Sequence, residues 1–199
     1  VKRLICSYAN VSMQKALDGE LSAKEWKKLM LAADQLKKSN IYIDDSSRVT
    51  PAEILSKCRR LQTTAGGVDL IMIDYIQLMS SGDSKMAGAE NRQQEIASIT
   101  RDLKIMAKEL GVPVIALSQL KRIQSKEPQL SDLRESGSIE QDADIVFFLY
   151  REDYYDEETE RQNIADLILA KHRRGATGKI EFYFDKERVR FMSLDNKHN

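Results

Sequence analysis

The chain has 199 residues, enough for one domain with a substantial core, and its 42% hydrophobic and 31% charged residues are typical of a globular protein. No apolar run approaches the length of a transmembrane helix and no signal-peptide pattern opens the chain, so we expect no membrane contact and a cytoplasmic location. Lys+Arg and Asp+Glu are both 31, which gives zero net charge, whereas a lone domain that grips DNA by long-range electrostatics is usually basic. Any nucleic-acid contact must therefore come from a few placed loops, multiplied by oligomerisation.

Two further features concern the chain as a whole. The sequence begins with Val1 in a helical pattern and without an initiator Met, so we expect it to be part of a longer polypeptide. Cys6 and Cys58 lie in helix-like segments and have no metal-ligand spacing, so we interpret them as reduced, buried thiols.

Helical patterns fill most of the first 65 residues. The segments 1–9 and 11–18 are short. Ser22 and Thr50 each begin a capping box, with Glu three residues later, that starts a longer helix. Residues 41–43 are expected to form a short strand between these two helices. The residues expected to face the core are Trp26, Leu29, Ala33 and Leu36 in the first long helix and Ile54, Cys58 and Leu61 in the second.

The stretch Val68–Met79 organises the prediction for the rest of the chain. Leu70–Ile73 are four apolar residues without alternation, which suits a strand buried on both faces of a parallel sheet. Asp74 follows at the carboxyl end, where open α/β sheets bind ligands, and a carboxylate there can hold a hydrated Mg²⁺ that carries nucleotide phosphates. Taken alone, the pattern fits a solvated or capping Asp better, and only downstream features reverse this preference.

Strands alternate with helices after this stretch and then follow one another closely. This order predicts an α/β fold with a mostly parallel sheet, flanked by helices, and an antiparallel hairpin at its C-terminal edge. Residues 153–163 are expected to be an acidic surface loop. The expected elements are a loop over 80–90, an amphipathic helix over 91–110 with Ile96, Ile99, Leu103, Met106 and Leu110 inward, and strands over 112–117, 145–150, 164–170, 179–184 and 189–192.

Gln119 ends the strand that follows the long helix. Its carboxamide cannot act as a base, but it can hydrogen-bond a γ-phosphate or orient an attacking water. The next segment, 120–137, is the basic one, so this position could couple phosphate state to a loop. Taken alone, Gln119 fits a surface loop residue; paired with Asp74, the functional interpretation becomes about as good.

Lys171 and Arg173 lie two apart at the end of another strand. Strand alternation places their side chains on one face, with His172 and Arg174 on the other. Two cations at a strand end could reach a phosphate across a subunit boundary, as an arginine finger does. A solvated basic hairpin tip explains this feature better when it stands alone. Neither His172 nor His198 has ligand spacing.

Four segments together resemble one protein family. In order they are IMIDYIQLM, ENRQQEIASITRDLKIMAKELGVPVIALSQL, SDLRESGSIEQDADIVFFLYR and AKHRRGATG, and they resemble the carboxyl-terminal motor domain of DnaB-type replicative DNA helicases. The similarity covers nearly the whole chain from Ile41 onward, and SDLRESGSIEQDAD is its most specific part. The resemblance implies a RecA-like ATPase fold over 1–199 and a homo-hexamer that uses ATP and Mg²⁺ to unwind duplex DNA while it moves on single-stranded DNA. It also implies a primase and a helicase loader as partners in a primosome, in a bacterial cell or a phage-infected host.

The resemblance also implies roles for individual residues. Asp74 matches the Walker B aspartate, which holds Mg²⁺ through water, and Gln119 matches the strand-end Gln that senses the γ-phosphate. Lys171 and Arg173 match the K-x-R pair that reaches the nucleotide of the neighbouring subunit. The loop that lines the pore and follows the single-strand backbone matches at Arg134, Glu135 and Gly137.

Two departures from the family pattern affect these expectations. The family has neutral residues around the finger, whereas His172 and Arg174 stand here, so the finger could be Arg173 or Arg174, and strand alternation favours Arg173. No G-x-x-x-x-G-K-[ST] motif occurs, and in the family this phosphate loop precedes the position of Val1, together with the glutamate that activates water. We therefore expect this chain alone neither to hydrolyse ATP nor to unwind DNA, although its parent does both.

Two other functions remain open at the level of sequence. One is a RecA-like ATPase of recombination or repair, against which SDLRESGSIEQDAD argues. The other is a non-catalytic DNA-binding module, in which the absence of the phosphate loop is the natural state. A phosphate loop immediately upstream in the parent gene would decide for the motor.

Overall fold

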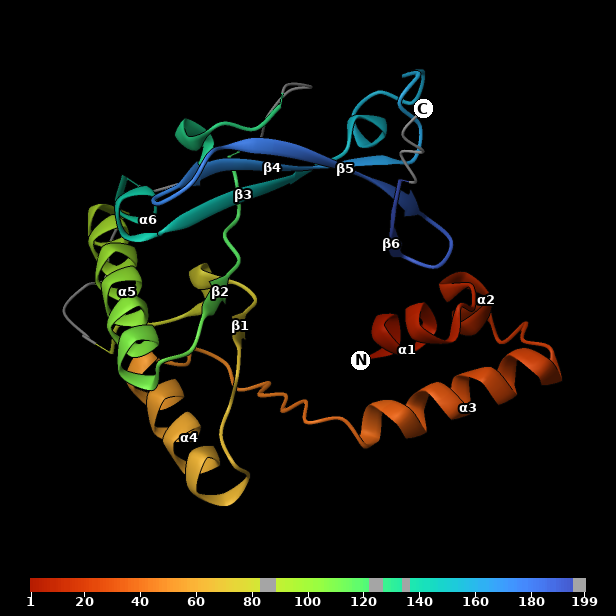
Figure 1. Cartoon of the computed structure of the whole chain (residues 1–199), viewed down its shortest axis with the longest axis horizontal. Helices are drawn as coiled ribbons and strands as arrows, with labels where there is room; N and C mark the ends of the chain where they lie inside the picture. Colours follow the sequence, from red (N-terminus) through yellow and green to blue (C-terminus); the bar gives the residue numbers. More distant parts are fainter. Residues whose placement is uncertain (83–88, 122–126, 134–136, 195–199) are drawn as a thin grey trace. The chain divides into compact units, whose positions relative to one another are not determined.

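The computed structural model describes residues 1–82, 89–121, 127–133 and 137–194, except for the side chains of residues 89–91. Contacts between residues group the chain into two compact units, and each unit is described by itself below. Figure 1 labels the helices and strands of the chain. Strands β3 (Ile145–Tyr150) and β4 (Ile164–His172) contribute residues to both units. Unit 1 consists of Val1–Asp44, Phe148–Ile168 and Gly178–Asn199, and unit 2 of Asp45–Phe147 and Leu169–Thr177.

Three helices of unit 1 pack around a small apolar core. They are α1 (Lys2–Ala9), α2 (Met13–Asp18) and α3 (Ala23–Lys37). The core consists of Cys6, Val11 and Leu29. The predicted capping box at the start of α3 is present, since Ser22 and Glu25 exchange hydrogen bonds with each other's backbone N–H. Cys6 and Cys58 are free and buried, as predicted.

Two predictions in the first 45 residues are wrong. The side chain of Trp26 is 54% exposed, because the buried residues of α3 are Leu29 and Ala32 and Trp26 lies about 90° around the helix from the centre of that stripe. Residues 41–43 do not form a strand, and their side chains are exposed. A strand needs a hydrogen-bonded neighbour, and no strand among the described residues pairs with this segment.

Unit 2 contains the long helices and a two-stranded parallel sheet. Its elements to residue 116 are α4 (Pro51–Thr64), β1 (Ile71–Ile73), the 3₁₀ turn η1 (Ile76–Leu78), α5 (Ala89–Leu110) and β2 (Val114–Ala116). β1 pairs with β2 in register, with Ile71 opposite Val114 and Ile73 opposite Ala116. Helix α5 packs against α4, β2 and η1. Its predicted inward stripe is confirmed at Ile96, Ile99, Leu103 and Met106, which are buried.

Strand β1 is not buried on both faces, and this prediction is wrong. Ile71 and Ile73 are buried, but Met72 between them is 63% exposed and Leu70 is also exposed. Alternate side chains of a strand point to opposite faces, so only one face of β1 is covered by the described residues. A run of apolar residues without alternation therefore does not by itself predict whether one face or both faces of a strand are buried.

A four-stranded sheet forms the C-terminal part, in the order β3-β4-β5-β6. Its strands are β3 (Ile145–Tyr150), β4 (Ile164–His172), β5 (Gly178–Asp185) and β6 (Arg190–Ser193), and β5 pairs with β6 antiparallel. The short elements η2 (Leu130–Asp132) and α6 (Gly137–Asp142) precede β3, and η3 (Glu152–Tyr154) follows it. Asp153 in η3 is buried, so the predicted acidic surface loop is wrong at this position. No helix in the described part of the chain is long and apolar enough to cross a membrane.

Candidate functional site

Asp74 and Gln119 follow the carboxyl ends of the two parallel strands of unit 2. The pairing continues past the strand ends, because the N–H of Leu117 donates to the carbonyl of Ile73 and the N–H of Ile76 donates to the carbonyl of Leu117, both at 2.9 Å. Both Asp74 and Gln119 are exposed. The Asp74 carboxylate has no hydrogen-bond or ion-pair partner among the described residues, so it is available to a hydrated cation. The predicted placement of these two residues at neighbouring strand ends is confirmed.

Gln77 fixes the end of β2 and was missed in the sequence. Its Oε1 accepts a hydrogen bond from the backbone N–H of Gln119 at 3.3 Å, and its Nε2 donates to Oγ of Ser118 at 3.0 Å. Nη2 of Arg92 donates to the carbonyl oxygen of Gln77 at 2.6 Å. Gln77 therefore ties the segment after Asp74 to the segment that carries Gln119. The only signal in the sequence is a polar side chain within the otherwise apolar run IQLM.

Lys171 turns inward at the end of β4. Its Nζ donates hydrogen bonds to the carbonyl oxygens of Glu140 and Ala143, at the carboxyl end of α6. A cation at this position satisfies carbonyl groups that have no partner within the helix and complements the helix dipole. Lys171 thus holds α6 against the end of β4.

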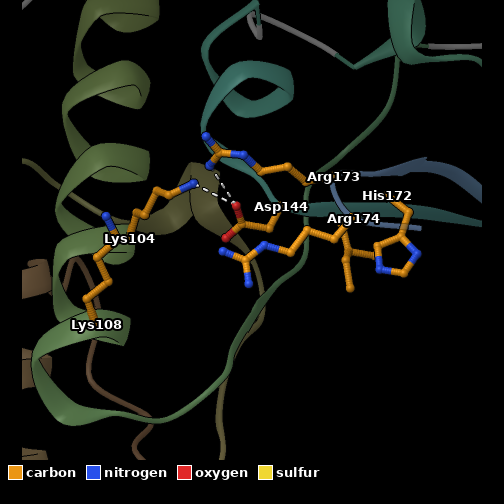
Figure 2. A pocket seen from close by; sticks show the side chains of 7 residues that line it. Lys104, Lys108, Asp144, His172, Arg173 and Arg174 are labelled. Atoms are coloured by element: carbon orange, nitrogen blue, oxygen red, sulfur yellow. Dashed lines mark hydrogen bonds and ion pairs between the residues drawn. The ribbon is translucent and has the colours of Figure 1, made fainter.

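Arg173 and Arg174 lie in the turn after β4, because the strand ends at His172. The predicted separation of their side chains by strand alternation is therefore wrong, since alternation holds only within a strand. His172, Arg173 and Arg174 all line one pocket (Figure 2).

This pocket has a volume of about 530 Å³ and lies within unit 2. Oδ1 of Asp144 accepts hydrogen bonds from Nζ of Lys104 at 3.0 Å and from Nη1 of Arg173 at 3.1 Å (Figure 2). These two hydrogen bonds, with that from Lys104 the stronger influence, lower the pKa of the Asp144 carboxyl below its usual value. The pocket is lined by Lys104, Lys108, Asp144, Ile145, His172, Arg173 and Arg174.

Cations outnumber carboxylates in this pocket, which is called the basic pocket below. Lys104, Lys108, Arg173 and Arg174 face a single carboxylate, that of Asp144. Lys108 and Arg174 form no ion pair with any described residue. The pocket therefore attracts anions, and guanidinium groups suit phosphate in particular.

The predicted site residues do not form one constellation. Asp74 and Gln119 do not line the basic pocket, so unit 2 contains two separate candidate sites: the ends of the parallel strands and the basic pocket. Arg134 and Glu135 lie outside the described residues, and Gly137 is the first residue of α6. No group of His, Cys, Asp or Glu with the arrangement of a metal site occurs in the described ranges.

Solved structures with similar folds define the class of the protein. The structure of a DnaB-like replicative helicase, determined together with its interactions with primase, superposes with a TM-score of 0.89 and 44% identity, over 98% of this chain and 47% of that one. A second solved structure is an ATPase domain, and it superposes with a TM-score of 0.88 and 44% identity, over 98% of this chain and 69% of that one. The chain has the RecA-like α/β fold of these proteins, as predicted.

Sequence comparisons give the family. The model of the DnaB-like helicase C-terminal domain matches residues 1–193. The chain is 50% identical to the replicative DNA helicase DnaC of Bacillus subtilis (strain 168) and 48% identical to the replicative DNA helicase DnaB of Geobacillus stearothermophilus, in each case over 99% of this chain. It spans 43% of the length of each of these relatives. The chain belongs to the DnaB-like helicase C-terminal domain family.

Proposed function

We propose that this chain is part of the motor of an ATP-dependent replicative DNA helicase, which unwinds duplex DNA while it moves on single-stranded DNA. The observation that carries the proposal is the placement of Asp74 and Gln119 at the ends of two adjacent parallel strands, with the Asp74 carboxylate exposed. Residues 1–199 form a partial RecA-like motor domain, and a longer protein in the cytoplasm of a bacterium or a phage-infected host supplies the phosphate loop.

Asp74 and Gln119 act on Mg²⁺-bound ATP in this proposal. Asp74 holds the metal through a water molecule, and the carboxamide of Gln119 hydrogen-bonds the γ-phosphate. Gln77 supports this role because it accepts the backbone N–H of Gln119 and fixes the end of β2. The bound metal supplies charge stabilisation for phosphoryl transfer.

In a homo-hexamer, Arg173 acts on the nucleotide of a neighbouring subunit, and Lys171, which does not line the basic pocket, supports it. The basic pocket supports the role of Arg173 because Arg173 lies there among several other cations, and the pocket does not include Asp74 or Gln119. Arg173 is the finger that reaches the phosphate. Lys171 supports it from the end of β4, since its Nζ is already bonded to the carbonyl groups of Glu140 and Ala143.

The loop that contacts single-stranded DNA contains Arg134, Glu135 and Gly137. Its support is a bridge between two segments that are distant in sequence: Leu120, next to Gln119, forms an antiparallel bridge with Leu133, immediately before Arg134. A change at the γ-phosphate can therefore pass to the DNA loop through one pair of residues. A primase and a helicase loader are the proposed partners, on the resemblance to the DnaB-type helicases.

The test is the substitution Asp74→Asn in the longer helicase. We expect ATP turnover to fall by about 100-fold or more, because the neutral amide no longer attracts the hydrated metal, while the hexamer stays intact. Asp69→Asn changes an exposed carboxylate just before β1 and serves as the matched control, with normal turnover expected. The 199-residue chain alone is expected to show no turnover. Unchanged turnover in Asp74→Asn would refute the proposal, and absence of turnover in the longer protein would favour a non-catalytic module.

A further inference from the structure

We propose that Asp144 is a positioning residue that orients the guanidinium of Arg173 for phosphate. The inference rests on the proposed role of Arg173 as a finger and names the residue that prepares it. Asp144 lies between the end of α6 and the start of β3, in the segment SDLRESGSIEQDAD.

Asp144 holds Arg173 at two points. Its backbone carbonyl accepts the N–H of Arg173 at 2.9 Å, which fixes the first residue after β4. Its Oδ1 accepts Nη1 of the guanidinium at 3.1 Å (Figure 2). The backbone contact fixes where the side chain begins, and the carboxylate contact fixes where its charged end lies.

The contact leaves most of the guanidinium available. Only Nη1 is used, so Nε and Nη2 retain donors for a second partner. The Arg173 side chain is 64% exposed and makes no other side-chain hydrogen bond or ion pair with the described residues. A phosphate can therefore bind the free side of the fork while Asp144 keeps the other side in place.

Lys104 keeps the contact from cancelling the charge of Arg173. Its Nζ donates to the same Oδ1 of Asp144 at 3.0 Å and to the backbone carbonyl of Asp142 at 2.6 Å. Thr100 of the same helix donates to the Asp142 carboxylate at 2.6 Å. Two cations thus share one carboxylate, so the group of Lys104, Asp144 and Arg173 keeps a net positive charge, and α5 anchors the segment that carries Asp144.

The alternative explanation for the contact between Asp144 and Arg173 is an ordinary surface ion pair with no catalytic role. Measurements of kcat and KM distinguish this explanation from the positioning role. A positioning residue lowers kcat with little effect on the KM for ATP, because the finger acts in the transition state. A structural pair would change the yield of folded protein or the hexamer, and would move kcat and KM together or not at all. If Asp144 orients Arg173 through its negative charge, a glutamate at position 144 should restore the kcat that an asparagine there loses.

The experiment compares four variants in the longer helicase: Asp144→Asn, Asp144→Glu, Lys104→Met and Glu109→Gln. Glu109 is an exposed carboxylate on α5 that pairs with Arg59, and it is the matched control. We expect Asp144→Asn to lower kcat about tenfold, because a loosely held finger is misplaced by a fraction of an ångström, with KM changed less than about twofold. Asp144→Glu should recover most of kcat. Lys104→Met should also lower kcat, since Asp144 then neutralises Arg173, and Glu109→Gln should behave as wild type.

Arg173→Ala, measured in parallel, distinguishes failure of this inference from failure of the proposed function. If Arg173→Ala leaves ATP turnover unchanged, the finger role itself is wrong and the inference falls with it. If Arg173→Ala abolishes turnover but Asp144→Asn has wild-type kcat, only the positioning role is overturned. A loss in Asp144→Asn that Asp144→Glu does not repair, or that raises KM by the same factor, also overturns it.

Discussion

Two clusters of charge in this protein are built in opposite ways. In unit 1, Asp153 and Asp166 have side chains that are 0% and 3% exposed, and each is bonded to two cations. In the basic pocket of unit 2, the exposed carboxylate of Asp144 stands among four cations. The buried carboxylates thus have cationic partners, whereas the exposed carboxylate of Asp144 is outnumbered by cations.

The contacts in unit 1 satisfy the buried carboxylates fully. Asp153 accepts hydrogen bonds from Arg151 at 3.0 Å and from the backbone N–H of Asn163 at 2.9 Å, and pairs with Lys186 at 2.8 Å. Asp166 pairs with Arg161 at 2.7 Å and with Lys179 at 3.0 Å. A charge removed from water needs such partners to remain ionised. This cluster therefore stabilises the fold, whereas the excess charge of the basic pocket is suited to a ligand.

The largest difference between the clusters should appear in stability. Asp166→Ala leaves Arg161 and Lys179 without their shared buried partner, so we expect the free energy of unfolding to fall by about 3 kcal/mol. Asp144→Ala removes an exposed partner, and we expect a change below about 1 kcal/mol. Urea unfolding of the 199-residue chain measures both. Equal losses would show that the two clusters do not differ in this way.

A smaller difference should appear at low pH. Burial raises the pKa of Asp153, but hydrogen bonds from Lys186, the N–H of Asn163 and Arg151 outweigh it, and the net pKa lies below the usual value. A lowered pKa in the folded state gives stability that is complete above the unfolded value of about 4 and is lost as the pH falls through the folded value. Wild type should therefore lose stability below about pH 4, and Asp153→Asn should lose less per pH unit, by at most about 1.4 kcal/mol. Identical slopes in urea unfolding at about pH 5, 4 and 3 would contradict this.

Local patterns predicted much of the fold, because they depend on neighbours in the sequence. Both capping boxes, the inward stripe of α5 and the bounds of β3 are set by spacing within one element. The placement of Asp74 and Gln119 followed because parallel strands end at the same edge of a sheet.

Features that depend on distant partners could not be predicted in this way. Residues 41–43 have a strand-like composition but no described strand beside them. Asp144 contacts Lys104 and Arg173, which are 40 and 29 positions away, so no local pattern marks it. The ion pair of Asp153 with Lys186 likewise joins residues far apart in the sequence, so no local pattern showed that a buried Asp153 would have a partner.

The end of β4 shows how the exact end of a strand changes a functional prediction. The strand was expected over 164–170, and applying its alternation onward to Arg174 put Arg173 and Arg174 on opposite faces. The strand ends at His172, and both arginines line the same pocket. Strand alternation had favoured Arg173 as the finger, but alternation does not apply beyond His172, and the contact of Arg173 with Asp144 is what now distinguishes the two arginines.

We propose above all that Asp74 and Arg173 act on one nucleotide from two different subunits. Mixed hexamers of the longer helicase, assembled from equal amounts of Asp74→Asn and Arg173→Ala, test it directly. Each variant alone should have almost no ATP turnover, but in mixed rings about a quarter of the interfaces combine an intact Asp74 with an intact Arg173. We predict that the mixed rings hydrolyse ATP at a substantial part of the rate expected from those intact interfaces. Mixed rings that remain as inactive as either variant alone would contradict the account.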